Sequence, residues 1–501
     1  MYESSNRGRP SAEFKLDDVD TYLYFEENAY WAGIMYESIQ RESKAKQIQL
    51  VICTDTLLEK LDRHAGWIRS QGGFFVNWNG FKWLARFASL KIRHFRPSRI
   101  LENQFKENQN VNVFRLPKEK KRFLLKVRKH HHTLQANPIL SRYLIEEIVN
   151  SSLAEDGATE HIESYMNSKK IGKYMDSVRS LANTLDHLLE NIHNADVIYM
   201  NGRTLHERVA FEICKVKDLG SYALEISANE ARVQKFSGTA VNSEFYSEAI
   251  ENFWSTFVEK NGLSLAELIG SEFFRMRRSN TKMNQFLRLF SNETEVSKDK
   301  EKQVTHFTFF TSSNEELKSL YSIYGGHQIN QNEIILQLIE FFSEEQNMKK
   351  FLTIRVHPNT RRKRKLDKVF FDGLNSSRNV RIIDYSNGMN SYELIESSDV
   401  VMTAGSTVGL EAAYMGKPSL TFARTLWEGL NCSKLVKSVS DLRNVLEIDT
   451  HYSKSQALKY GLFMMEYGFE LEYFDLARLR TKDSHSYFDQ ISRFKKSSQK
   501  H

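Results

Sequence analysis

The chain has 501 residues, of which 41% are hydrophobic and 12% aromatic, and it carries a formal net charge of +7. One hydrophobic core does not organise a chain of this length, so we expect two domains, and the apolar content argues against long disorder. The first eighteen residues lack a signal-peptide pattern and no run of eighteen apolar residues occurs. We therefore expect neither secretion by a signal peptide nor a membrane-spanning segment, and we expect a cytoplasmic protein.

Three cysteines, Cys53, Cys214 and Cys432, lie far apart in the sequence and form no CxxC pair. This spacing fits neither a zinc site nor a redox motif, so we interpret them as reduced thiols that pack in the interior.

The positive charge is concentrated between Lys91 and Lys129, a stretch that contains thirteen Lys and Arg residues but only three Glu, and His130–His132 follow it. Such a region attracts anionic partners, and the inner membrane face or an anionic polymer would qualify. A solvated basic face without a partner is the alternative for residues 91–132. Nucleic acid is the weakest option, because no helix-turn-helix, zinc or RNP-like pattern accompanies the charge.

The chain begins with alternating strand and helix signals. Strands are predicted at Thr21–Glu27 and Lys46–Asp55, with helical spacing between them, which implies parallel pairing through a crossover. The basic region then interrupts the pattern, so residues 91–190 are interpreted as a basic and helical insertion within an N-terminal domain spanning 18–290.

The alternation returns with a strand at Ala195–Met200, a polar turn at Asn201–Arg203 and a helix that ends at Gly220. The next strand is Ser221–Ile226, with Glu225 near its end. Residues 227–290 are mixed and largely helical, and the polar, aperiodic stretch 291–303 is the best linker candidate.

The second half is more regular. Five strands are predicted within VTHFTFF, KKFLTIRV, RIIDY, DVVMTA and SLTFA, with helices between them. This order specifies a doubly wound parallel sheet, whose ligands bind at the carboxyl ends of the strands. We therefore expect a C-terminal domain at 304–452 and, at 453–492, a helical segment that packs back onto the rest.

The turn Gly405-Ser406-Thr407 follows one of these strands and precedes a helix. Glycine permits a tight turn or the close approach of a ligand, and Ser406 or Thr407 can cap the helix. Together with free N–H groups these hydroxyls suit a phosphate, whereas a plain helix cap is the simpler interpretation. Glu411 does not have the spacing of a capping box, so a ligand such as a ribose is a reasonable partner for it.

Polar residues also end two other strands. His357, just before Pro358, can hydrogen-bond a phosphate or protonate a leaving group, and Arg355 can add a second cation. Ser312 and Ser313 supply hydroxyls at the first strand of this domain. No cluster has the spacing of a metal site, so we expect neither a metal nor a cofactor.

Several stretches resemble one known family. IRVHPN (354–359), SYELIESSDVVMTAGSTVGLEAAYMGKPSL (391–420) and FFTSSNEE (309–316) are similar to the donor domain of bacterial capsule and surface polysaccharide glycosyltransferases of the GT-B fold, including Kdo transferases. The HP and Ser-Thr pairs also resemble motifs of GT-B sialyltransferases that use CMP-sugars. More loosely, residues 197–226 are similar to the Asn-Gly-Arg segment of the capsule group.

The resemblance implies two Rossmann-like domains and transfer of a sugar from a nucleotide donor to a glycan or glycolipid acceptor. By the same resemblance, His357, Ser406 and Thr407 would bind the donor phosphate and Glu411 would lie by the ribose. Asn201, Arg203 and Glu225 would lie on the acceptor side, with Glu225 as the catalytic base.

Two alternatives remain open from the sequence. A CDP-glycerol-type phosphotransferase uses related turns but transfers a phosphoryl-linked unit. A non-catalytic scaffold that binds a polyanion or a membrane surface would explain the basic region, although His357, Ser406 and Glu411 argue against it. A nucleotide-sugar 2-epimerase is disfavoured because the Asp-Ser-Gly-Gly turn is absent from this position.

Overall fold

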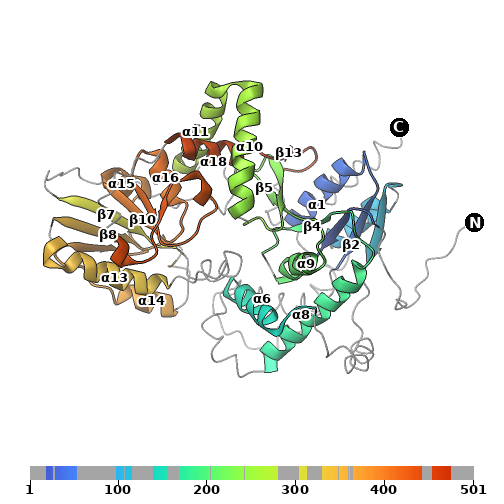
Figure 1. The fold of residues 1–501 in the computed structure, drawn as a ribbon, viewed down its shortest axis with the longest axis horizontal. Helices are drawn as coiled ribbons and strands as arrows, with labels where there is room; N and C mark the ends of the chain where they lie inside the picture. Colours follow the sequence, from blue (N-terminus) through green and yellow to red (C-terminus); the bar gives the residue numbers. More distant parts are fainter. Residues whose placement is uncertain are drawn as a thin grey trace, which may run out of the picture.

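The computed structural model describes residues 18–25, 29–53, 97–106, 108–115, 139–155, 169–203, 205–241, 243–279, 304–312, 330–347, 349–358, 360, 365–442 and 454–475. These residues form two separate β-sheets with helices packed on them, and a group of helices lies between the sheets (Figure 1). Within the described part of the chain, no helix combines the length and the apolar character that a membrane crossing requires.

The first sheet has seven strands in the order β13-β6-β5-β4-β1-β2-β3. Strands β1 to β5 pair in parallel, whereas β6 and β13 add an antiparallel edge. The strands are β1 (Thr21–Tyr24), β2 (Ile48–Ile52), β3 (Val111–Arg115), β4 (Val197–Met200), β5 (Ser221–Ile226), β6 (Arg232–Ser237) and β13 (Phe469–Glu470). The helices are α1 (Ala29–Glu42), α4 (Pro97–Phe105), α6 (Arg142–Glu155), α8 (Lys169–Leu188) and α9 (Leu205–Val216).

The central strands of this sheet are buried on both faces, which explains why their sequences are nearly continuous apolar runs. Side chains alternate between two cores. Leu23 and Tyr199 belong to the core that includes α8 and α9, whereas Tyr22 and Ile198 belong to the core that includes α1 and α4.

The basic region does not interrupt the sheet as expected from the sequence. Within the range 91–190, α4 and β3 continue the α/β alternation, and β3 pairs with β2 in parallel over its whole length. Strand β3 was not predicted because it lies at the edge of the sheet, where few side chains need to be apolar, and basic and polar residues surround it in the sequence. The interpretation of 91–190 as a basic and helical insertion is therefore wrong for residues 97–115.

The second sheet has six strands in the order β12-β11-β10-β7-β8-β9, and every neighbouring pair is parallel. Its strands are β7 (Thr305–Phe310), β8 (Lys350–Arg355), β9 (Val380–Ile383), β10 (Val400–Thr403), β11 (Ser419–Thr421) and β12 (Lys434–Leu435). Its helices are α13 (Gln331–Ser343), α14 (Lys365–Asp372), α15 (Ser391–Ser397) and α16 (Val408–Tyr414), with short 3-10 turns at η3 (Glu345–Asn347), η5 (Glu428–Leu430) and η6 (Val439–Asp441). Two α/β units built on parallel sheets confirm the GT-B-like fold class.

Three helices connect the two sheets: α10 (Ser243–Asn261), α11 (Leu263–Ser279) and α18 (Lys454–Glu466). Helices α10 and α11 form a hairpin beside α18 and α16 (Figure 1). Helices α11 and α18 approach closely at two glycines: a Cβ added to Gly461 would lie 2.3 Å from the carbonyl oxygen of Gly270. One hydrophobic core runs from the first sheet through these helices to Leu410 and Ala413 of α16.

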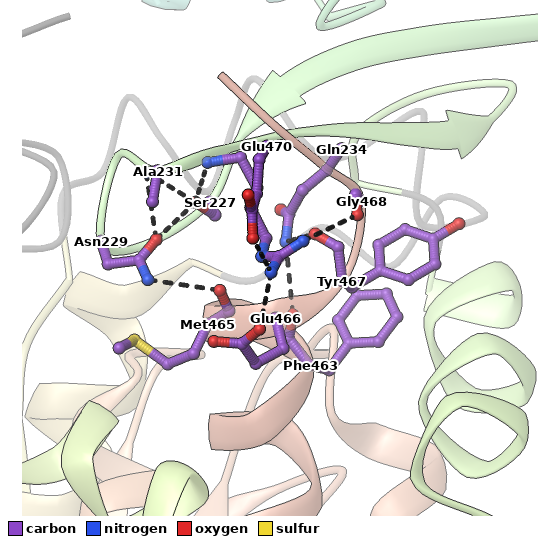
Figure 2. Close-up of polar contacts among 11 residues, drawn as sticks. Ser227, Asn229, Ala231, Gln234, Phe463, Met465, Glu466, Tyr467, Gly468 and Glu470 are labelled. Atoms are coloured by element: carbon purple, nitrogen blue, oxygen red, sulfur yellow. Dashed lines mark hydrogen bonds and ion pairs between the residues drawn. The ribbon is translucent and has the colours of Figure 1, made fainter. Parts of the chain in front are cut away.

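The end of α18 docks onto the antiparallel edge of the first sheet (Figure 2). Gln234 donates from its side-chain amide to the carbonyls of Phe463 and Tyr467, at 3.3 and 3.2 Å. Arg232 forms ion pairs of 2.9 Å with both Glu466 and Glu470. These contacts attach the segment that follows the second sheet to the first sheet.

The chain beyond β13 is held by a buried carboxylate of α1. Glu37, which is 2% exposed, accepts hydrogen bonds from the backbone N–H groups of Glu472, Tyr473 and Phe474, at 3.1, 2.6 and 2.9 Å. A charged acceptor that serves three buried donors is a strong attachment, because hydrogen bonds to ionised groups are worth more than neutral ones.

Candidate functional site

The order of strands in the second sheet singles out one position. The chain places β8 and β9 on one side of β7, then crosses to place β10, β11 and β12 on the other side. The topological switch point thus lies between β7 and β10. In doubly wound sheets, ligands bind outside the carboxyl ends of the strands at this point. Residues 311–312 follow β7 there and residues 405–407 follow β10.

The turn after β10 has the backbone that its glycine allows. Gly405 has a φ of 88°, in the left-handed region that residues with a Cβ rarely adopt. The Ser406 hydroxyl accepts a long hydrogen bond of 3.4 Å from the N–H of Val408. Thr407 is the N-cap residue of α16, but its side chain makes no capping hydrogen bond. Of the two predicted candidates for the cap, Ser406 accepts from the first N–H of α16, and the Thr407 hydroxyl does not cap the helix.

The Thr407 hydroxyl instead accepts a hydrogen bond of 2.8 Å from Nη2 of Arg277, on α11. The same guanidinium reaches Oε1 of Glu411 with Nε at 2.7 Å and Nη2 at 2.5 Å. Arg277 and Glu411 are 2% and 1% exposed, so this is a fully buried ion pair. Burial alone would lower the pKa of Arg277, but the negative charge of Glu411 outweighs it and the pKa is raised.

Tyr392 of α15 completes this cluster. Burial, followed by the negative charge of Glu411, raises the pKa of the Tyr392 phenol well above its ordinary value. The Tyr392 hydroxyl and Oε2 of Glu411 are both buried, and neither has a hydrogen-bond partner among the described residues. The ribose role of Glu411 remains a prediction, and Arg277 supplies a protein partner for its other oxygen. No local pattern distinguishes Arg277 from the neighbouring cations of the helical segment FFRMRRS, so it was not predicted from the sequence.

His357 follows β8, and its backbone N–H donates to Oγ1 of Thr311 at 2.9 Å. This bond ties the end of β8 to the end of β7. His357 and the Gly405 turn both lie at the carboxyl ends of the strands, but the strands that they follow, β8 and β10, are separated by β7. The His357 side chain is half-buried.

Arg355 is placed differently from its proposed role as a second phosphate-binding cation. Its side chain is 2% exposed, and the guanidinium donates to the carbonyls of Asp384, Asn387 and Met389, at 2.6, 2.9 and 3.4 Å. Burial lowers the pKa of Arg355. In this arrangement Arg355 shapes the loop after β9.

Ser312 is bracketed by a side chain of α13. Gln331 accepts from the N–H of Ser312 at 2.6 Å and donates to its carbonyl at 3.0 Å, which reproduces the pairing of a neighbouring strand. Gln331 is 1% exposed and fixes the backbone immediately after β7. Ser313 lies outside the described residues.

The first sheet has its own switch point, between β1 and β4. Asn201 and Gly202 follow β4 in the left-handed region, with φ of 51° and 78°. Asn201 donates to Oε2 of Glu225 at 2.6 Å, and Oε1 of Glu225 accepts from the N–H of Ile226 at 3.1 Å. The structure thus brings Asn201 and Glu225 together, while Arg203 lies two residues further along the same turn.

His206 at the start of α9 was not singled out from the sequence. Its ring stacks on Phe25, which follows β1, with centroids 5.7 Å apart. Burial lowers the pKa of His206 to about 4, so it is neutral at physiological pH.

Of the basic region 91–132, the structure describes only residues 97–106 and 108–115. Here Arg99 is exposed, and Lys106 pairs with Glu102 at 3.1 Å. His130–His132 and most of the Lys and Arg residues lie outside the described part of the chain. Contact of this region with an anionic membrane face remains a prediction.

Comparison with known families bears on the second sheet. Residues 286–434 match the family described as "Capsule polysaccharide biosynthesis protein". The match includes the turns after β7, β8 and β10, and it confirms the resemblance to the capsule group for this range. No curated protein sequence matches the chain.

Solved structures of low identity were also found. The β-Kdo 2,4-transferase KpsC of Thermosulfurimonas dismutans has a TM-score of 0.33 at 15% identity, over 55% of this chain and 80% of its own. The β-Kdo 2,7-transferase of the same KpsC has a TM-score of 0.34 at 14% identity, over 56% and 80%. A UDP-GlcNAc 2-epimerase from Neisseria meningitidis, solved with UDP-GlcNAc, has a TM-score of 0.24 at 14% identity, over 89% and 98%.

Proposed function

We propose that the chain is a metal-independent glycosyltransferase of capsule polysaccharide synthesis. It would move a sugar from a nucleotide-activated donor, with a CMP-sugar favoured and UDP- or GDP-sugars next, to a cell-surface glycan or glycolipid acceptor. The observation that carries the proposal is the switch point between β7 and β10, because the family-matched turns at 311–312 and 405–407 flank it.

The donor phosphate would bind at the turn Gly405–Thr407. Gly405 has no side chain to block the approach of a phosphate oxygen, and Ser406 and Thr407 carry hydroxyls. His357, at the same edge of the sheet, would donate a hydrogen bond to the phosphate or a proton to the departing nucleotide. Glu411 would serve the ribose.

The reaction would be a displacement at the anomeric carbon. The bond to the phosphate oxygen breaks, negative charge accumulates on the departing nucleotide, and fixed donors that meet this charge accelerate the step. On the acceptor side, Glu225 would take the proton of the attacking hydroxyl. Asn201 donates to Oε2 of that carboxylate at 2.6 Å and thereby orients it.

Thermal-shift titration with CMP, CDP, UDP and GDP tests the proposal. We expect one nucleotide to raise the melting temperature and both His357→Ala and Ser406→Ala to weaken that shift. Two matched controls should leave it unchanged: His306→Ala, at the amino end of β7, and Ser343→Ala, at the exposed end of α13. If no nucleotide shifts the melting temperature, the proposal is wrong, and loss of the shift in a chelator would refute metal independence.

Product analysis separates the open alternatives. A glycosyltransferase yields an acceptor without added phosphorus, whereas a CDP-glycerol-type phosphotransferase adds phosphorus that ³¹P NMR detects. Nucleotide binding without turnover over a panel of donors and acceptors would support the non-catalytic scaffold.

A further inference from the structure

We propose that Arg277 is a positioning residue of the donor turn Gly405–Thr407 and connects this turn to the helices shared by the two sheets. The inference rests on the proposed function, since it concerns the same donor site. Arg277 belongs to α11, which precedes the second sheet in the chain, yet its guanidinium contacts Thr407 and Glu411 of that second unit.

The contacts of Arg277 leave its guanidinium little freedom. Its donors reach Thr407 Oγ1 and Glu411 Oε1 at 2.5 to 2.8 Å, and its carbon Cζ lies 5.7 Å from the ring centroid of Phe273. The guanidinium is planar and its donors form a rigid fork, so the two acceptors are held at a fixed separation. Arg277 therefore sets where the Thr407 hydroxyl lies relative to Glu411.

The chemistry of the contact also fixes the direction of the Thr407 hydroxyl proton. A guanidinium can only donate, so Thr407 must accept from it, and its own proton points elsewhere. That proton remains available for an acceptor such as a phosphate oxygen. In addition, Arg277 compensates the negative charge of Glu411, which would otherwise repel an anion bound four residues away along the chain. Both effects favour phosphate at the turn.

Arg277 is itself held by the helices between the sheets. Helix α11 packs on α18 through Gly270 and Gly461, where the two backbones are in direct contact. The end of α18 is bonded to β6 of the first sheet, as Figure 2 shows for Gln234 and its partners. Through Arg277, the position of the donor turn therefore depends on the position of α11 and α18, and α18 is bonded to the first sheet.

The variant Arg277→Lys tests the inference, because it keeps a buried cation but loses the fork that reaches two acceptors. We expect the ligand-free melting temperature to change little while the nucleotide Kd rises about tenfold. Arg278→Lys is the matched control: Arg278 is the next residue, its side chain is exposed, and it pairs with Glu396 at 2.7 Å. That variant should bind nucleotide as the wild type does.

A double-mutant cycle with Thr407→Val distinguishes positioning from a general structural role. If Arg277 acts through the Thr407 hydroxyl, Arg277→Lys should weaken binding no further once that hydroxyl is gone. If the two substitutions weaken nucleotide binding independently, so that the Kd of the double variant rises by the product of the two single effects, the inference is wrong. It is also wrong if the folded Arg277→Lys protein binds nucleotide with the affinity of the wild type. Should Arg277→Lys fail to fold, Thr407→Ser against Thr407→Val decides: equal affinities would overturn the inference.

The two proposals fail in different ways. If the wild-type protein binds no nucleotide, the proposed function falls and the role of Arg277 falls with it. If the wild type binds a nucleotide and Arg277→Lys binds it equally well, only the role of Arg277 is wrong.

Discussion

Replacing Gly461 by alanine should separate α11 from α18. The new Cβ would lie 2.3 Å from the carbonyl oxygen of Gly270 and 3.1 Å from its carbonyl carbon, and both are backbone atoms that no rotamer change can move. The helices would have to move apart, at a cost of about 1–3 kcal/mol for overpacking. Alanine also gains about 1 kcal/mol of helix propensity over glycine. We expect a net loss of stability, because a 2.3 Å contact places the steric cost at the upper end of its range.

The matched control is Gly172→Ala in α8, where no described residue outside the helix's own backbone comes within 4 Å of the new Cβ. This variant gains helix propensity without a steric cost, so it should be more stable than the wild type by about 1 kcal/mol. Urea unfolding followed by circular dichroism compares the two. If Gly461→Ala is as stable as Gly172→Ala, the close approach of α11 and α18 is wrong.

Three further changes have defined outcomes. Glu37→Gln should weaken the attachment of residues 472–474 by about 2 kcal/mol, because a neutral amide replaces a charged acceptor, and limited proteolysis should release that segment faster. Burial lowers the pKa of His206 from its ordinary value of 6.5 to about 4. Between these two pH values only the unfolded chain binds a proton at His206, so the contribution of His206 to the free energy of unfolding should be constant above pH 6.5 and fall as the pH drops towards 4. The full loss is about 3 kcal/mol, and His206→Phe unfolded in urea at pH 5 and pH 7.5 should lack this part of the pH dependence. Gln331→Leu removes both bonds to the Ser312 backbone and should cost about 1–3 kcal/mol in urea unfolding.

The fold was predictable where burial determines the sequence. In the second sheet, β7, β8, β10 and β11 lie within the apolar runs that predicted them, and β9 begins one residue before its predicted run. In the first sheet, β5 has the predicted bounds Ser221–Ile226. Strands β3, β6, β12 and β13 were missed, and each lies at or near an edge of its sheet. Gln234 in β6, for instance, is buried but polar, since it bonds to the backbone carbonyls of Phe463 in α18 and of Tyr467 just after it.

The candidate site was predictable only in its local parts. The turns after β7, β8 and β10 were identified because polar residues end apolar strands there. The roles of individual side chains depend on partners far away in the sequence, which no local pattern shows. Arg355 bonds to carbonyls of the loop after β9, and the Thr407 hydroxyl bonds to Arg277, which lies 130 residues earlier.

The docking of α18 on the first sheet has a consequence for the order of synthesis. Arg232 and its partner Gly468 are 236 residues apart, so β6 has no neighbour on its outer side until the whole second unit has been made. During that interval the nascent chain exposes an unpaired strand edge, a typical starting point for aggregation. The charges of Arg232 and Lys235 on β6 protect such an edge, and we expect neutral substitutions there to reduce the yield of folded protein more than its final stability.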